Sequence, residues 1–262
     1  MSFIEIKDLY KRYGQTTALN GINLNIESGQ IYGILGPNCS GKTTLLKIMA
    51  AILAPTTGSV YINGIKTYDN PDKIKSIIGY IPETPALYES LTPVEFFNFI
   101  GSVFHIDDKD LKQRINAFTS ALELTKYLNE FIGSLSFGTK QKVAIISALI
   151  HDPELIIMDE GMNGLDPKSS KIIKELLKSL TEKGKTVIFS THIMEIAETV
   201  CDNISILYNG NIAGTGNLEA LRQEAGSSNS DLEDVFLKLT GDEDLDNLLN
   251  SLKDTIKSTT HE

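Results

Sequence analysis

The clearest chemical motif in the chain is a glycine-rich loop that ends in a lysine and a threonine. It fits the pattern G-x-x-x-x-G-K-[ST], placed between an apolar strand and a helix as phosphate-binding loops require. Small residues let backbone N–H groups curl around phosphate oxygens, and the helix directs its positive end at them. Lys42 adds a charge for the outer phosphates, and the Thr43 hydroxyl suits Mg²⁺. We expect these residues to bind the phosphates: Gly36, Pro37, Asn38, Cys39, Ser40, Gly41, Lys42, Thr43 and Thr44.

Two carboxylates follow a second apolar run, at 155–158. Open parallel sheets bind their ligands at the carboxyl ends of the strands, so Asp159 and Glu160 are placed at such an edge. There Asp159 can hold Mg²⁺, and Glu160 can orient or deprotonate an attacking water. Acidic residues at a strand end are common by themselves, and it is the pairing with the phosphate loop that makes this pattern specific.

A histidine follows the strand expected at 186–189. A lone histidine in such a place is usually structural. His192 would emerge at the same sheet edge as Glu160, which favours contact with a γ-phosphate. His105, His151 and His261 have no such context, and we expect them to be structural or surface residues.

A hydroxyl and a glycine precede the apolar helix expected at 143–150. Ser136 is placed to cap that helix, which is a purely structural role. A helix N-terminus with a hydroxyl also forms an anion site. Because a long segment separates Ser136 from the phosphate loop, we expect its phosphate to belong to another subunit.

A sheet must position these groups. Apolar and polar residues alternate at 22–26, which predicts a half-buried strand, and the run at 31–35 predicts a buried one. Strands are also expected at 60–62, 77–81, 155–158, 187–189 and 204–208, and helices at 43–49 and 172–180. Strand, helix, strand with short connections indicates a parallel sheet. Asn63-Gly64 and Asn209-Gly210 predict hairpin turns.

Two further segments differ from this core. Prolines and helical spacing at 82–134 predict a mostly helical insertion. After a candidate linker at 226–230, the apolar positions at 231–239 and 245–256 predict one or two amphipathic helices with an acidic face. The simpler interpretation is a tail that packs on its own domain or frays. A regulatory or dimer-contact role is the alternative.

Composition excludes several classes of protein. The chain has 262 residues, 41% of them hydrophobic, and a formal charge of −10. One large domain, or one with an insertion, is expected, and disorder of the whole chain is excluded. The carboxylate surplus argues against a nucleic-acid partner. Two cysteines cannot build a disulfide scaffold. The sequence shows neither a signal-peptide pattern nor the apolar run of about 18 residues that a membrane span needs. We therefore expect a cytoplasmic protein.

Together these motifs resemble the nucleotide-binding subunit of an ABC transporter over about residues 3–220. The phosphate loop matches Walker A, 155–160 matches Walker B, 135–141 the signature, and 163–167 the D-loop. The resemblance implies an α/β fold: a P-loop NTPase (RecA-like) core with an antiparallel β subdomain and a helical insertion at about 83–148. An ABC ATPase domain would span 1–225, and an acidic helical tail 226–262.

The resemblance also implies roles. Two such subunits sandwich two ATP molecules head to tail and hydrolyse them with Mg²⁺. The catalytic residues implied are Glu160, His192 and Lys42; the metal ligands implied are Thr43, Glu83 and Asp159. Tyr13 matches the aromatic that stacks on adenine, and Asp166 belongs to the D-loop. The signature residues that would contact the other subunit's ATP are Ser136, Phe137, Gly138 and Thr139.

Some positions depart from the family pattern. Cys39 replaces a glycine, which costs roughly 1 kcal/mol or more if the position needs a positive φ. Glu83 stands where the family has glutamine, Phe137 and Thr139 leave the signature fewer polar contacts, and Gly161-Met162 replaces Pro-Thr.

Pro82-Glu83 and the tail at 232–241 resemble the simple (ABC-2 type, drug-resistance-like) exporters with separately encoded membrane subunits. The partners implied are an integral membrane permease and a second ATPase subunit, identical or paralogous, which would hold the chain at the inner face of the cell membrane. Four aromatic residues either contact the permease or form the insertion's own core: Tyr88, Phe96, Phe97 and Phe99. The alternatives are a soluble ABC-class ATPase and a weakly hydrolysing regulatory or immunity module.

Overall fold

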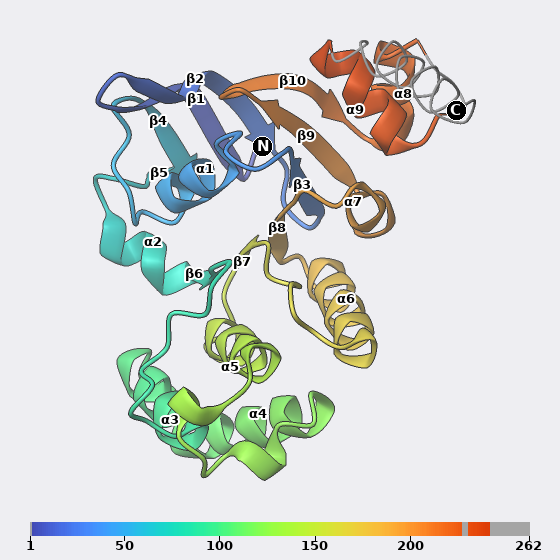
Figure 1. The fold of residues 1–262 in the computed structure, drawn as a ribbon. Helices are drawn as coiled ribbons and strands as arrows, with labels where there is room; N and C mark the ends of the chain where they lie inside the picture. Colours follow the sequence, from blue (N-terminus) through green and yellow to red (C-terminus); the bar gives the residue numbers. More distant parts are fainter. Residues whose placement is uncertain (1, 227–229, 242–262) are drawn as a thin grey trace, which may run out of the picture.

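The computed structural model describes residues 2–226 and 230–241 and contains two sheets (Figure 1). The smaller sheet is antiparallel where its strands pair, with the order β2-β1-β4-β5. Its strands are β1 (Ile4–Tyr13), β2 (Thr16–Ile26), β4 (Thr57–Ile62) and β5 (Ile65–Lys66). On β2, Ile22, Leu24 and Ile26 are buried and the residues between them are exposed, which confirms the alternation predicted there.

The larger sheet has the order β10-β9-β3-β8-β7-β6. Its strands are β3 (Ile31–Leu35), β6 (Ile78–Ile81), β7 (Leu155–Asp159), β8 (Thr186–Thr191), β9 (Asn203–Tyr208) and β10 (Asn211–Gly216). Neighbouring strands from β9 to β6 run parallel, and only the pair of β9 with β10 is antiparallel. The carboxyl ends of β3, β6, β7 and β8 therefore meet at one edge, as the sequence predicts.

The parallel strands are buried on both faces. On β7, Leu155 and Ile157 pack into the core shared with the antiparallel sheet and helix α1 (Lys42–Met49). Ile156 and Met158 point to the opposite face and pack with α5 (Phe137–Leu149) and α6 (Pro167–Glu182). Because both faces are covered, these strands read as continuous apolar runs rather than as alternating ones.

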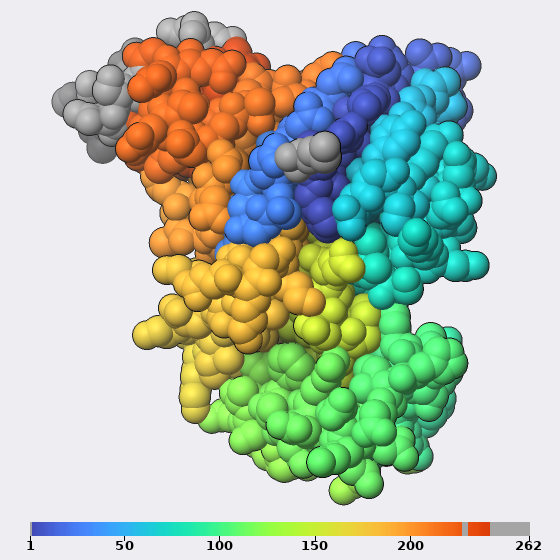
Figure 2. All heavy atoms as spheres, turned by 180° about the vertical axis from the view of Figure 1, so that it is seen from behind, coloured from blue at the N-terminus to red at the C-terminus, as the bar shows by residue number. Residues whose placement is uncertain are grey.

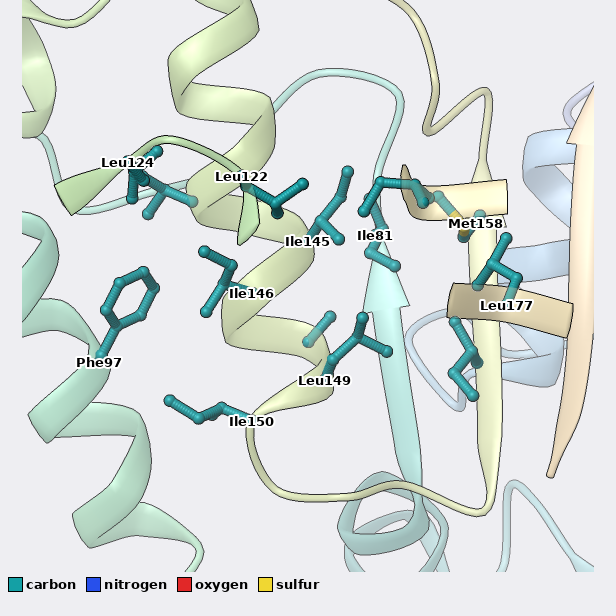
Figure 3. Close-up of a cluster of buried hydrophobic side chains, with 14 of the residues drawn as sticks. Ile81, Phe97, Leu122, Leu124, Ile145, Ile146, Leu149, Ile150, Met158 and Leu177 are labelled. Carbon is teal, nitrogen blue, oxygen red and sulfur yellow. The ribbon is translucent and has the colours of Figure 1, made fainter. Parts of the chain in front are cut away.

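The segment between β6 and β7 is helical, as predicted. It contains α3 (Pro93–Val103), α4 (Asp108–Ala121), two short 3₁₀ turns and α5, and it forms the lower part of the molecule in Figures 1 and 2. Helix α5 joins this part to the sheet. In Figure 3 its isoleucines and Leu149 lie between Phe97 of α3 and the side chains of Ile81 and Met158.

Three helices of seven residues each were not predicted: α2 (Pro71–Ile77), α7 (Met194–Val200) and α8 (Leu218–Glu224). The strand expected at 77–81 begins at Ile78, because Ile77 ends α2 (Pro71–Ile77). A helix of seven residues is too short for its apolar spacing to be recognised, although Pro71 in its first turn is a usual start. The prediction of an α/β nucleotide-binding core with an antiparallel subdomain and a helical insertion is confirmed.

The described part of the tail packs on the core. Helix α7 (Met194–Val200), α8 (Leu218–Glu224) and α9 (Leu232–Thr240) share a buried cluster with β3 and β9, to which α9 contributes Leu232, Val235 and Phe236. The division of the chain near residue 225 stays a prediction. Residues 227–229 of the expected linker, the helix expected at 245–256 and His261 lie outside the described residues. In the described ranges no helix has both the length and the apolar character needed to cross a membrane.

Candidate functional site

The glycine-rich loop connects β3 to α1, and close approach fixes its shape. A Cβ atom at Gly36 would lie 2.1 Å from the carbonyl oxygen of Leu207, so only glycine fits there. The N–H of Gly210 donates to the Ser40 carbonyl at 3.0 Å. The end of β9 and the turn that follows it therefore hold the loop in its curled form.

Cys39 lies at the exposed tip of this loop with a φ of 66°. The position therefore does need the left-handed conformation, and a side chain there costs roughly 1 kcal/mol or more relative to glycine. The loop keeps its shape despite this local strain.

Lys42 is held at the centre of the loop. Its ammonium donates to the carbonyl oxygens of Gly36 at 2.8 Å and Pro37 at 3.1 Å, and it lies 3.5 Å from a carboxylate oxygen of Glu160. Lys42 and Glu160 are each only 6% exposed. A buried cation faces a buried anion across the space beside the loop, an arrangement in which their attraction is screened little.

A cavity of about 300 Å³ opens over the loop. It is lined by Ala18, Asn38, Cys39, Gly41, Lys42, Thr43, Thr44, Glu83 and Glu160. The buried hydroxyl oxygen of Ser40 has no hydrogen-bond partner among the residues that the structure describes. An orphaned hydroxyl, a lysine and the N-terminus of α1 at one place suit a phosphate group.

Glu160 follows directly from β7 and pairs with His192, which follows β8. The His192 Nδ1 lies 2.9 Å from both carboxylate oxygens of Glu160. The N–H of Glu160 donates to the Ser190 carbonyl at 3.2 Å and reaches the Ser190 hydroxyl at 3.1 Å. Two neighbouring strand ends thus fix the carboxylate that is expected to activate water and bring His192 to it.

Asp159 ends β7 one residue earlier and is 1% exposed. The Ser190 hydroxyl donates to its Oδ1 at 2.8 Å. Thr43 and Glu83 line the phosphate-loop cavity, whereas Asp159 is not among the lining residues. The structure therefore places two of the three expected metal ligands on the cavity wall and the third behind the wall.

The oxygen donors of Thr43, Glu83 and Asp159 suit Mg²⁺, but they are too few to fill its coordination sphere without phosphate oxygens or waters. Within the described ranges no cluster of three or more histidine, cysteine or acidic side chains could hold a metal ion by itself. Mg²⁺ is commonly held by one or two carboxylates together with phosphate oxygens and waters. A hydroxyl and two carboxylates beside a phosphate loop agree with that mode of binding.

Tyr13 stands apart from the loop. It ends β1, is 50% exposed, and the Lys11 ammonium lies 5.0 Å from the centre of its ring. The ring is not among the residues that line the loop cavity. Its role in adenine stacking stays a prediction, for which an exposed ring is a suitable starting point.

The signature residues form the N-terminus of α5. Ser136 caps the helix, accepting the Thr139 N–H at 3.3 Å and bonding the Thr139 hydroxyl at 2.8 Å. Phe137 is 46% exposed. None of Ser136, Phe137, Gly138 and Thr139 is among the residues lining the chain's own phosphate-loop cavity. Both interpretations of Ser136 therefore remain compatible: it caps the helix and presents that helix end outward.

The signature packs against the D-loop of the same chain. A Cβ atom at Gly164 would lie 2.5 Å from the Phe137 ring, and one at Gly138 would lie 2.4 Å from the Gly164 carbonyl oxygen. The buried Gln141 side chain donates to the Gly161 carbonyl at 2.8 Å. The start of α5 and the segment after Glu160 therefore form one packed unit.

Asp166 begins α6 as its cap. Its carboxylate accepts from Lys142 at 2.8 Å and from the N–H and hydroxyl of Ser169 at 2.8 and 2.7 Å. These hydrogen bonds, that of Lys142 first, lower the pKa of Asp166 below its usual range. The side chain is thus an anion at neutral pH and ties α6 to α5.

Sequence reasoning missed two contributors. Ser190 links Asp159 and Glu160, and the signal was available: it is a small polar residue inside an apolar strand, two positions before His192. Gln141 was noted only as part of the signature. That its amide reaches back to Gly161 depends on the approach of α5 to the sheet, which no local pattern shows.

A phosphate loop, acidic strand ends, a histidine at the same edge and a helical insertion with an outward-facing helix end define an ATP-binding cassette. The family model described as "ABC transporter" matches residues 19–163. The chain belongs to the ABC transporter family, as the ATP-binding and ATP-hydrolysing subunit.

Related ATP-binding proteins are similar in sequence to this chain over most of its length. The ABC transporter ATP-binding protein NatA of Bacillus subtilis is 36% identical over 222 residues, 84% of this chain and 89% of NatA. The ABC-type transporter ATP-binding protein EcsA of the same organism is 34% identical over 92% of this chain and 97% of EcsA. The bacitracin transport ATP-binding protein BcrA of Enterococcus faecalis is 34% identical over 84% of this chain and 71% of BcrA.

Solved structures of ATP-binding cassettes have the same fold as this chain. One described as the ATP-binding subunit of an ABC transporter superposes with a TM-score of 0.87 at 31% identity, covering 91% of this chain and all of that one. The ATP-binding cassette MJ0796, described as a dimer in a post-hydrolysis state bound to ADP and Pi, has a TM-score of 0.76 at 32% identity, covering 82% of this chain and 98% of that one.

Proposed function

We propose that this chain powers export of a substrate through a separate membrane permease, by closing head to tail with a second ATPase subunit around two Mg·ATP. The observation that carries the dimer is the position of the signature. Ser136 and the exposed Phe137 form a helix end that lies outside the chain's own phosphate-loop cavity. A helix N-terminus with a hydroxyl suits a phosphate, and a second subunit can supply that phosphate.

In this proposal, different residues of the chain bind the phosphates, hold the metal ion and activate the water. Lys42 and the loop N–H groups bind the phosphates, and Thr43, Glu83 and Asp159 would hold Mg²⁺. When bound, Mg²⁺ neutralises phosphate charge and helps place the reacting phosphoryl group. Glu160 accepts a proton from the attacking water, and His192, 2.9 Å from Glu160, keeps that carboxylate in place and contacts the γ-phosphate.

Two of the four insertion aromatics are available to a permease. Phe96 and Phe97 are buried, whereas Tyr88 is 58% and Phe99 45% exposed, with their ring centres 5.8 Å apart. They line a shallow hollow between the start of the insertion and α3. An exposed aromatic pair is a usual contact for a protein partner. Binding there would hold the chain at the inner face of the membrane.

Export as the direction is supported by the names of the relatives, among them bacitracin transport for BcrA and linearmycin resistance for LnrL. Those substrates are theirs. For this chain we propose only that the permease moves its substrate outward, because selectivity would reside in the permease.

The dimer is tested by cross-linking. The chain has one exposed cysteine, Cys39, on the phosphate loop. In a Phe137→Cys variant, mild oxidation with ATP and Mg²⁺ should join two subunits, giving a band of twice the mass on a non-reducing gel. The matched control carries Phe137→Cys and Cys39→Ala and should stay monomeric. A link confined to single chains would contradict the head-to-tail arrangement.

A further inference from the structure

The hydroxyl of Tyr80 is one of the buried polar groups without a hydrogen-bond partner among the described residues, and neither phosphate binding nor the proposed hydrolysis uses it. Its oxygen is buried and forms no hydrogen bond of good geometry with any residue that the structure describes. Buried hydroxyls are nearly always paired, and each exception calls for a physical explanation. The neighbours of Tyr80 supply one.

The sheet register places Tyr80 and Asp159 on the same face. Tyr80 of β6 is aligned with Ile157 of β7, and in parallel strands aligned residues point to the same side. Asp159 is two residues beyond Ile157 and so shares that side, which is the face covered by α1. Ser190 of β8 is aligned with Asp159 and completes the row. Tyr80 therefore lies on the same face as Asp159, on the strand on the other side of β7 from Ser190. A diagonal neighbour two residues along the next strand is within reach of a long aromatic side chain.

The charges around the hydroxyl agree with this placement. Burial first, and then the negative charges of Asp159 and Glu83, raise the pKa of Tyr80 far above its ordinary value. A phenol hydroxyl is a hydrogen-bond donor, and these two carboxylates are, with Thr43, the groups proposed to hold Mg²⁺.

We propose that Tyr80 is a positioning residue of the metal site: its hydroxyl donates to the Asp159 carboxylate and, with Ser190 on the other side, fixes the orientation in which Asp159 meets Mg²⁺. Ser190 already occupies Oδ1 at 2.8 Å. A second donor would restrain the carboxylate's rotation. Groups that orient a metal ligand in this way typically change metal affinity by about 10- to 100-fold when removed. The inference rests on the proposed Mg²⁺ site.

The test is a Tyr80→Phe variant, which keeps the ring and removes only the oxygen. Mn²⁺ is used as a spectroscopic probe, and its affinity for the complex of the protein with a non-hydrolysable ATP analogue is measured by electron paramagnetic resonance. We expect Mn²⁺ to bind about tenfold more weakly, while the affinity for the analogue in EDTA stays within about twofold, since packing is retained.

Tyr32→Phe is the matched control. Tyr32 lies in the same buried cluster, but its hydroxyl bonds Ser205 at 2.7 Å and Thr215 at 2.8 Å. Its loss should leave Mn²⁺ affinity unchanged. Equal Mn²⁺ affinity in wild type and Tyr80→Phe would overturn the role of Tyr80, and so would an equal loss of analogue affinity in EDTA, which would indicate packing. If wild type itself binds no Mn²⁺ with the analogue, the proposed metal site fails and this role fails with it.

Discussion

The ammonium of Lys142 lies 2.8 Å from the carboxylate of Asp166, so the helix that begins with the signature is tied to the helix that follows the D-loop. The contact joins two segments that the sequence separates by the whole of β7 and the catalytic strand end. Together with Phe137 on Gly164 and Gln141 on Gly161, it makes the signature and the D-loop of one subunit a single unit.

The ion pair of Asp166 with Lys142 should stabilise the fold at neutral pH and lose that effect in acid. The pKa of Asp166 is lowered in the folded chain, so its stabilisation is complete above the unfolded value of about 3.9 and is lost as the pH falls below it. Asp166→Asn keeps a good helix cap but not the charge. The difference in Tm between wild type and this variant should be largest at neutral pH and shrink as the pH falls below about 4. A constant difference would show that the charge of Asp166 contributes nothing.

Cys39 should be destabilising because of its backbone. Cys39 has a φ of 66°, which brings its Cβ close to the following carbonyl oxygen. Cys39→Gly removes that Cβ, whereas Cys39→Ala keeps it. Urea unfolding should give a free energy of unfolding for Cys39→Gly about 1 kcal/mol above that for Cys39→Ala. Equal values would mean that the loop relaxes without cost.

The same thiol should make ATP hydrolysis sensitive to alkylation. Cys39 is exposed on the cavity wall, while burial raises the pKa of Cys201 to about 12 and keeps it protonated. Iodoacetamide should therefore modify Cys39 and lower turnover, and bound ATP should slow both effects. The Cys39→Ala variant serves as the control and should resist the reagent. Full turnover by completely modified wild-type protein would rule the idea out.

Ser190 should matter for stability as well as for the site. Ser190→Ala leaves the buried Asp159 carboxylate without its 2.8 Å donor, which should lower the free energy of unfolding by about 2 kcal/mol. Ser205→Ala removes an equally buried hydroxyl that bonds only neutral partners, and should cost about 1 kcal/mol. Denaturant unfolding of both variants at pH 7 compares them; a larger loss for Ser205→Ala would contradict the account.

The local patterns were sufficient for the elements and the loop. Apolar runs predicted β3, β7 and β8, because parallel strands buried on both faces need no polar alternation. The family pattern has a glycine at the position of Cys39, which raised the question of a positive φ there, and the structure has a φ of 66°. These features depend on neighbours in the sequence.

What could not be predicted depends on contacts across the fold. That Phe137 covers Gly164, or that Ser190 of β8 donates to Asp159 of β7, follows from sheet order and from the approach of α5. The division of the four insertion aromatics into a buried pair and an exposed pair follows likewise from how α3 packs. Tertiary packing of this kind leaves no local signal in the sequence.

The central claim is that Glu160 activates the water that hydrolyses ATP, and a Glu160→Gln variant tests it most directly. The amide keeps the size of the side chain and removes its basicity. Steady-state phosphate release should fall about a hundredfold or more, while ATP still binds and sedimentation with ATP and Mg²⁺ shows a stable dimer. Hydrolysis at the wild-type rate would contradict the assignment of Glu160 as the base.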